Sequence, residues 1–198
     1  MTKRIGLTGG IACGKSVVTD RLKTHGIPVL DTDQVAHELL KPDNPVFDSI
    51  VKRFGAEMVD AQTGEINRSL LGHKVFEDVS ERRALNALMH PEIGKRWRNW
   101  LRAQTSGLAV VAIPLLFEVG VEKDFDGILC VWSPEPVMIE RLKKRNLTQN
   151  EAALRIQAQM PVALKVEKST WTLKNNSTLE NLYTQVDEWV KKCTPQEN

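Results

Sequence analysis

The segment Gly9-Gly10-Ile11-Ala12-Cys13-Gly14-Lys15-Ser16 constrains this chain more than any other stretch. It matches the pattern G-x-x-x-x-G-K-[ST] and directly follows the apolar run 5–7. In a loop of this kind a strand delivers the chain, glycines allow a tight turn, and the N-terminus of the next helix directs backbone N–H groups at an anion. We therefore predict a strand at 3–8, a phosphate-binding loop, and a helix at 15–24.

The loop residues have separate predicted tasks. The Lys15 ammonium provides a positive charge for the terminal phosphates of a nucleotide, and the Ser16 hydroxyl is placed to bind Mg²⁺. Backbone N–H groups supply the remaining contacts to the nucleotide. The predicted nucleotide-binding residues of this segment are Gly10, Ile11, Ala12, Cys13, Gly14, Lys15, Ser16 and Val17. The alternative is a chance glycine-rich turn, which the preceding strand and following helix disfavour.

Composition excludes several other classes of protein. The chain has 198 residues, enough for one sizeable core, and its 27 basic and 25 acidic residues give a net charge of +2, which does not favour nucleic acid as a partner. The longest apolar run, 108–117, is far below the about 18 residues that a membrane span needs and contains Pro114. The N-terminus leads directly into the first strand and leaves no room for a signal peptide, so we expect a cytoplasmic protein with no membrane association. We also expect no obligate protein partner.

The remaining apolar runs complete a sheet. Strands are predicted at 27–30, 108–113, 127–132 and 171–175, with helices between them and a closing amphipathic helix at 179–192. Strands that alternate with helices favour a parallel sheet covered on both faces. We predict an α/β fold with three layers and five parallel strands, in a single domain over 1–198.

Residues 41–106 differ from the rest because they are mostly helical and lie between two predicted strands of the same sheet. We interpret them as a helical insertion that binds a second substrate, the acceptor. Within it, His90-Pro91 is expected to interrupt a helix, since the residue before proline is disfavoured in helical conformation.

Residues 134–168 are helical and cationic. Arg141 and Arg145 are four positions apart and are expected to share a helix face, with Arg155 and Lys165 further along. Two interpretations remain open: a solvated charged surface, or a lid over the nucleotide.

Two aspartates follow the second predicted strand. If the chain stays extended, Asp31 and Asp33 face the same way from the carboxyl end of that strand, where open α/β sheets bind their ligands. The alternative is that Asp33 only caps the helix predicted at 34–40.

A phosphate-binding loop alone does not select a reaction. The Asn-Lys-x-Asp string of guanine-specific switches is missing from the sequence. Phosphoryl transfer to a hydroxyl needs cradled phosphates, a metal, a carboxylate that deprotonates the acceptor, and cations that stabilise the developing charge. The loop, Ser16 with Mg²⁺, Asp33 and the arginines of 134–168 are candidates for these four parts.

Several motifs between residue 5 and about residue 176 have the order and spacing of a known family. They are Gly6-Leu7-Thr8-Gly9-Gly10-Ile11-Ala12-Cys13-Gly14-Lys15-Ser16, Asp31-Thr32-Asp33, Gly64 with Arg68, Leu88-Met89-His90-Pro91-Glu92-Ile93, Pro114-Leu115-Leu116-Phe117-Glu118, Arg141 with Arg145, Arg155-Ile156 with Gln159, and Asn175. By these motifs the chain resembles the dephospho-coenzyme A kinases, which have a P-loop NTPase fold with a helical lid at the position of 134–168.

The resemblance implies phosphorylation of the ribose 3′-hydroxyl of dephospho-coenzyme A by ATP with Mg²⁺. It implies the following roles: Asp33 as general base, with Lys15 and Arg141 as the other catalytic residues; Arg145 and Asn175 in nucleotide binding; Asp31, Arg68, His90 and Pro91 in substrate binding; and Ser16 on the metal, with Asp33 or Glu118 as further partners through water. For Glu118 the alternative is that it only ends its strand. Another small-molecule P-loop kinase, such as a nucleoside monophosphate kinase, and a non-catalytic nucleotide-binding switch remain as alternatives.

The chain departs from the family pattern at Ala12-Cys13, where Gly-Ser is usual, and at Thr170, Lys174 and Ser177. Ala12 is expected to be tolerated if its backbone angles are ordinary. For Cys13 there are two hypotheses: a reactive thiol whose pKa is lowered by the loop N–H groups and Lys15, or an inert small side chain.

Overall fold

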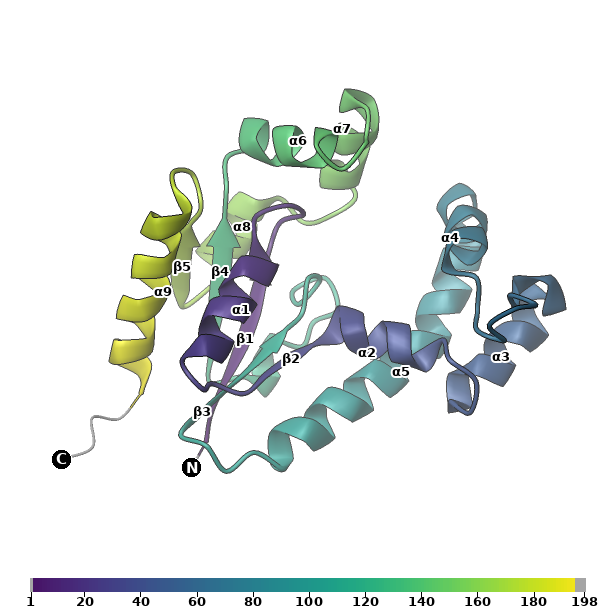
Figure 1. Ribbon diagram of the computed structural model, residues 1–198, viewed down its shortest axis with the longest axis horizontal. Coiled ribbons are helices and arrows are strands. Elements are labelled where there is room, and N and C mark those ends of the chain that lie inside the picture. The colour runs from purple at the N-terminus through teal and green to yellow at the C-terminus, as the bar shows by residue number, and fades with distance from the viewer. Residues whose placement is uncertain (1, 195–198) are drawn as a thin grey trace. The chain divides into compact units, whose positions relative to one another are not determined.

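The computed structural model describes residues 2–194, apart from the side chains of residues 76 and 77, and the chain divides into two compact units (Figure 1). The sheet unit comprises the residues up to Asp31 and those from Ala103 onward. The helical unit is Thr32–Arg102.

The sheet unit contains five parallel strands in the order β2-β3-β1-β4-β5. The strands are β1 (Lys3–Gly9), β2 (Val29–Asp31), β3 (Leu108–Ala112), β4 (Gly127–Trp132) and β5 (Trp171–Lys174). In the centre, Ile5 of β1 is in register with Val110 of β3 and with Gly127 of β4. The predicted α/β fold with a five-stranded parallel sheet is confirmed.

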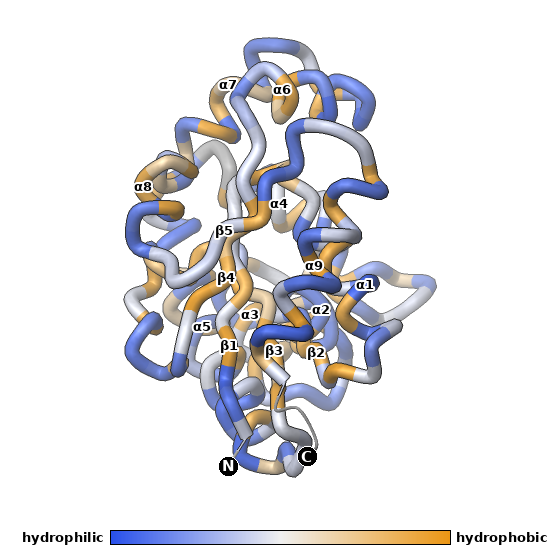
Figure 2. The backbone as a smooth tube through the Cα atoms, turned by 90° about the vertical axis from the view of Figure 1, so that its left-hand side faces the viewer, coloured by the Kyte–Doolittle hydropathy of each residue, from blue (hydrophilic) through white to orange (hydrophobic). Residues whose placement is uncertain are grey.

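The central strands form the core of the sheet unit. All five residues of β3 are buried, which explains why its sequence is an unbroken apolar run instead of an alternating pattern. Figure 2 shows this hydrophobic colouring along β3 and β4. Helices α1 (Lys15–Thr24) and α9 (Leu179–Cys193) add Leu22, Leu182 and Val186 to the same cluster. The core thus holds both ends of the loop between β1 and α1.

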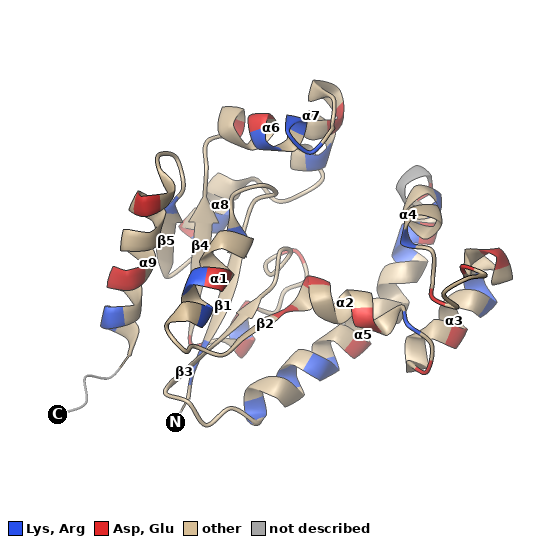
Figure 3. Cartoon of the chain, viewed as in Figure 1, with Lys and Arg blue, Asp and Glu red and all other residues tan. Residues whose placement is uncertain are grey.

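The segment predicted as a lid contains the helices α6 (Glu135–Lys143), α7 (Gln149–Gln157) and α8 (Val162–Glu167), and Figure 3 marks charged residues of both signs along α6 and α7. A short 3₁₀ turn, η2 (Glu122–Asp124), precedes β4. Because α6 ends at Lys143, Arg145 lies in the turn after it. The prediction that Arg141 and Arg145 share a helix face is therefore wrong.

The helical unit contains α2 (Thr32–Leu39), α3 (Pro45–Phe54), the 3₁₀ turn η1 (Ala56–Met58), α4 (Arg68–Glu77) and α5 (Val79–Arg102). Helix α5 continues through Pro91, so the predicted interruption at His90-Pro91 is wrong. Proline removes one helix hydrogen bond and its ring crowds the preceding turn, but the buried side chains of Met89, Trp97 and Leu101 hold α5 on both sides of it.

The insertion predicted at 41–106 overlaps the helical unit, which also includes α2. Its acceptor-binding role stays a prediction. Among the helices of the described residues, none is both long enough and apolar enough to cross a bilayer.

Candidate active site

The loop between β1 and α1 turns at two glycines that no other residue can replace without a shift. Gly14, before the first residue of α1, has φ +97°, and a Cβ there would collide with the Asn175 side-chain amide. A Cβ on Gly9 would lie 2.5 Å from the Val131 carbonyl oxygen. These contacts give the physical reason for both glycines of the motif.

Ala12 adopts a left-handed backbone conformation, with φ +58°. Alanine in place of glycine was expected to be tolerated only with ordinary backbone angles, and Ala12 does not have them. A residue with a Cβ is destabilised by about 1–2 kcal/mol in this region. The Ala12 side chain is buried in a small cluster with Leu142 and Ala152. Packing against α6 and α7 thus helps to hold the unfavourable conformation.

Two side chains bind the carbonyl oxygens at the middle of the loop. Arg141 Nη1 donates to the Ala12 oxygen at 3.1 Å, and Asn175 Nδ2 donates to the Cys13 oxygen at 2.9 Å. Arg141 Nη2 also donates to Asn175 Oδ1 at 3.0 Å. The loop is therefore tied to α6 and to the end of β5 by side chains that support each other.

Ser133, which the sequence reasoning missed, lies at the centre of this network. Its side chain is fully buried, accepts a hydrogen bond from Arg141 Nη1 at 3.0 Å, and donates one to the Asn175 carbonyl oxygen at 2.7 Å. The only signal in the sequence is its place directly after a predicted strand, at the edge where α/β sheets bind ligands.

In this structure Arg141 and Asn175 thus bind the backbone of the phosphate-binding loop. Their predicted contacts with the nucleotide stay predictions. Two loop N–H groups also have protein acceptors: Ile11 N–H donates to Gln159 Oε1 at 3.0 Å, and Cys13 N–H donates to the Gly10 oxygen at 3.2 Å.

The reactive-thiol hypothesis for Cys13 is contradicted by burial. Its side chain is fully buried, and burial raises the pKa of the thiol by more than the Ser133 hydrogen bond and the Lys15 charge lower it. In the folded loop this thiol is therefore shielded from reagents.

Glu118 has a structural partner that the sequence did not reveal. Its Oε1 lies 2.8 Å from Lys165 Nζ and accepts a hydrogen bond from Met160 N–H at 2.9 Å. The Lys165 side chain is fully buried, while Glu118 is 22% exposed. Strand β3 ends at Ala112, so Glu118 does not simply end the strand. Its predicted contact with a metal through water stays a prediction.

The solvated-surface interpretation of the cationic segment is wrong for two of its members. Arg141 is half-buried against the loop and Lys165 is fully buried. Arg145 and Arg155 are exposed, as that interpretation expects.

The second strand and its aspartates differ from the prediction. Asp31 is the last residue of β2, and Asp33 is an exposed residue in the first turn of α2, which begins at Thr32. Because the chain is already helical there, the argument from an extended backbone fails. The cap-only alternative also fails, since Asp33 lies inside the helix.

The other predicted substrate-binding residues lie in the helical unit. Arg68 is exposed at the start of α4, and His90 and Pro91 are exposed within α5. Their predicted roles stay predictions, like that of Asp31. His90 does not end its helix, which removes the alternative that treated His90-Pro91 as a helix-terminating pair.

The donor set suits a magnesium ion that is held mainly by phosphates and water. Ser16 is exposed in the first turn of α1. Over residues 2–194, with side chains 76 and 77 left aside, no three His, Cys, Asp or Glu side chains are grouped to hold a metal. Mg²⁺ commonly keeps several waters and binds substrate phosphates with few protein ligands, so Ser16 fits such an ion.

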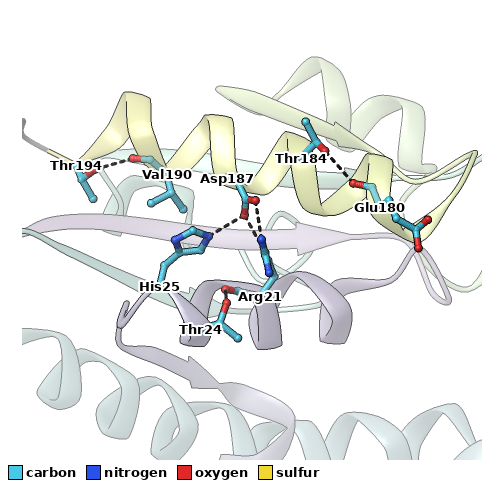
Figure 4. Close-up of polar contacts among 8 residues, drawn as sticks. All are labelled: Arg21, Thr24, His25, Glu180, Thr184, Asp187, Val190 and Thr194. Atoms are coloured by element: carbon cyan, nitrogen blue, oxygen red, sulfur yellow. Dashed lines mark hydrogen bonds and ion pairs between the residues drawn. The ribbon is translucent and has the colours of Figure 1, made fainter.

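Helix α1 is fixed at its other end by α9, as Figure 4 shows. Arg21 makes two hydrogen bonds to the Asp187 carboxylate, at 2.8 and 2.6 Å, and His25 Nε2 lies 2.7 Å from the same carboxylate. The Arg21 guanidinium also lies 4.9 Å from the centre of the Tyr183 ring. The hydrogen bonds from Arg21 and then His25 hold the pKa of Asp187 well below its usual range.

A glycine-bounded loop that joins the central strand of a parallel 2-3-1-4-5 sheet to a helix is the arrangement of the P-loop class of proteins, which bind nucleotide phosphates. The family model described as Dephospho-CoA kinase (CoaE) matches residues 3–181, and a dephospho-CoA kinase of Bdellovibrio bacteriovorus is 38% identical over 192 residues, covering 96% of this chain and 95% of that protein. The chain therefore belongs to the dephospho-CoA kinase family and has the phosphotransferase activity of that family.

Two solved structures share the fold. The protein TT1252 from Thermus thermophilus superposes with a TM-score of 0.82 at 33% identity, over 98% of this chain and 99% of that one. A dephospho-CoA kinase from Campylobacter jejuni, 22% identical, has the same fold with a TM-score of 0.73 over 98% of each chain. The family match decides against the nucleoside monophosphate kinase and the non-catalytic switch.

Proposed function

We propose that this chain transfers the γ-phosphate of ATP to the ribose 3′-hydroxyl of dephospho-coenzyme A, with the loop 10–17 holding the ATP phosphates. The observation that carries the proposal is the loop itself. It is built on buried strands, shaped by Gly9 and Gly14, and tied at the carbonyls of Ala12 and Cys13. A loop fixed in this way before the nucleotide arrives loses little freedom on binding.

The side chains of the loop supply the charges. Lys15 stabilises the terminal phosphates, and the Ser16 hydroxyl binds Mg²⁺, which neutralises charge on the phosphate oxygens when it is bound. Arg141, and Arg145 from the turn after α6, add positive charge for the transferred group. Asn175 contacts the nucleotide from the end of β5.

Most residues of the acceptor side belong to the helical unit, and Asp31 is the last residue of β2. Asp33, exposed in the first turn of α2, accepts the proton of the ribose hydroxyl as general base. Asp31, Arg68, His90 and Pro91 bind dephospho-coenzyme A, and the Arg68 guanidinium suits its phosphates.

The test compares acceptors and variants in one assay. ADP release with MgATP is measured with dephospho-coenzyme A and with a nucleoside monophosphate, and only the former is expected to give turnover. Asp33→Asn is expected to lower kcat by about 10²–10⁴-fold, because a general base is lost, while ATP affinity in calorimetry stays the same. The matched control is Asp48→Asn, an exposed aspartate of α3 in the same unit, which is expected to leave kcat unchanged.

Two outcomes contradict the proposal. Full turnover by Asp33→Asn removes the assigned base. Equal turnover with the nucleoside monophosphate removes the assigned acceptor.

A further inference from the structure

Gln159, which lies between α7 and α8, binds a backbone N–H group of the phosphate-binding loop. Gln159 Oε1 accepts the hydrogen bond of Ile11 N–H at 3.0 Å. Gln159 is half-buried in the turn after α7, and its own N–H donates to the Ile156 oxygen at 3.2 Å. The beginning of the phosphate-binding loop is thus joined to the last turn of α7.

Met160, the residue after Gln159, is bound by Glu118. Met160 N–H donates to Glu118 Oε1, which forms the ion pair with the buried Lys165. Lys165 Nζ also donates to the Pro114 oxygen at 2.8 Å, and the same oxygen accepts from Thr8 Oγ1 at 3.1 Å.

These bonds make a closed path. It runs from β1 through Pro114, Lys165 and Glu118 to the backbone at 160, and returns through Gln159 to the loop that follows β1. The buried Lys165 ammonium is paired with the Glu118 carboxylate, which also binds Met160 N–H. The backbone directly after Gln159 is therefore bound by a carboxylate of this ion pair.

We propose that Gln159 is a positioning residue for phosphate binding. By accepting the Ile11 N–H it holds the first peptide of the loop in place before the nucleotide arrives, and the Glu118–Lys165 pair holds Gln159. The proposal rests on the proposed function of the loop in binding the ATP phosphates. Side chains that lock a binding loop reduce the free-energy cost of ordering it.

Cys13 provides a readout that needs no nucleotide. Its thiol is fully buried, so a thiol reagent reaches it only when the loop opens. The rate of Cys13 alkylation is measured by peptide mass spectrometry on the nucleotide-free protein. Loss of one hydrogen bond in Gln159→Ala is expected to raise this rate about threefold to tenfold.

Two further variants separate positioning from general loosening. Gln157→Ala removes an exposed amide from the end of α7 and is expected to alkylate at the wild-type rate. Gln159→Glu keeps an acceptor for Ile11 N–H and is also expected to alkylate slowly, but its negative charge should repel the ATP phosphates.

Kinetics complete the test. Gln159→Ala is expected to raise KM for ATP about threefold to tenfold with kcat within about twofold of wild type, because the lost bond acts on nucleotide binding. Gln159→Glu should raise KM at least as much. Wild-type alkylation of Cys13 in Gln159→Ala, or an unchanged KM for ATP in Gln159→Ala, overturns the inference. Absence of MgATP binding to the wild type in calorimetry instead overturns the proposed function, and the alkylation rates still decide the inference.

Discussion

The two units differ in how far apart in the sequence the partners of their hydrogen bonds lie. In the sheet unit, Asn175 binds a carbonyl 162 positions away and Arg141 one 129 positions away. In the helical unit, Asn67 caps α4 through Leu70 N–H, and its own N–H binds the Met58 oxygen. The site built on the sheet therefore depends on partners that no short motif contains, while α4 of the helical unit begins at a cap that the adjacent sequence supplies.

The difference implies that removing one distant partner in the sheet unit should cost more than removing one local cap in the helical unit. Distant contacts close large loops and lie in the buried part of the sheet unit, where an unpaired group loses its water. Local caps lie at the surface, where water can replace them.

Lys165→Met is expected to have the largest effect on stability. It leaves the Glu118 carboxylate without its buried cation, and because Glu118 is 22% exposed the cost should be about 2–3 kcal/mol, near the lower end for a broken buried pair. Urea unfolding measures the free energy. Lys168→Met changes an exposed lysine just beyond α8 and serves as the control, with a change of about 0.5 kcal/mol or less. Equal small changes in both variants would mean that the ion pair adds no stability.

The same pair shows where sequence reasoning reaches its limit. The glycines, the strand before them and the helix after them form a local pattern, so the loop and the helix 15–24 were predicted at their observed positions. The residues next to Lys165 in this cationic segment do not indicate whether the lysine is buried or solvated. Its burial depends on Pro114 and Glu118, about 50 positions earlier.

Ser133 and the helical unit illustrate the same point. Ser133 acquires its partners only when α6 and the end of β5 come together. In the helical unit the errors were local: Pro91 was weighed on backbone preference alone, and packing of α5 outweighed that preference.

Ser133→Ala is expected to have the second largest effect. It removes a fully buried hydroxyl and leaves the Asn175 oxygen without one donor, which should cost about 1–2 kcal/mol of unfolding free energy. KM for ATP should also rise, because Arg141 loses an acceptor that orients it. Ser177→Ala changes an exposed serine after β5 and is the control. Identical KM values in the two variants would exclude a role for Ser133 in ordering the loop.

Asn67→Ala tests the local side of the comparison. It removes the side-chain acceptor of Leu70 N–H at the start of α4 and should cost about 1 kcal/mol, the usual value of a helix cap. Asn67→Ser keeps a capping oxygen and should restore most of the loss. KM for ATP should be unchanged in both. A loss larger than that of Ser133→Ala would reverse the order expected for local and distant contacts.

The ion pair between α1 and α9 should give the smallest effect, because it is distant in sequence but accessible to water. Arg21 and His25 hold the pKa of Asp187 below its usual range, so the folded protein keeps this carboxylate ionised where the unfolded chain takes up a proton. Its contribution is complete above about pH 5 and is lost as the pH falls toward the folded value. The urea midpoint of the wild type should therefore fall more steeply between pH 5 and pH 3 than that of Asp187→Asn, and Glu188→Gln, an exposed neighbour on α9, should follow the wild type. Parallel curves for Asp187→Asn and wild type would show that even a charge pair 166 positions apart in sequence adds nothing when water reaches it.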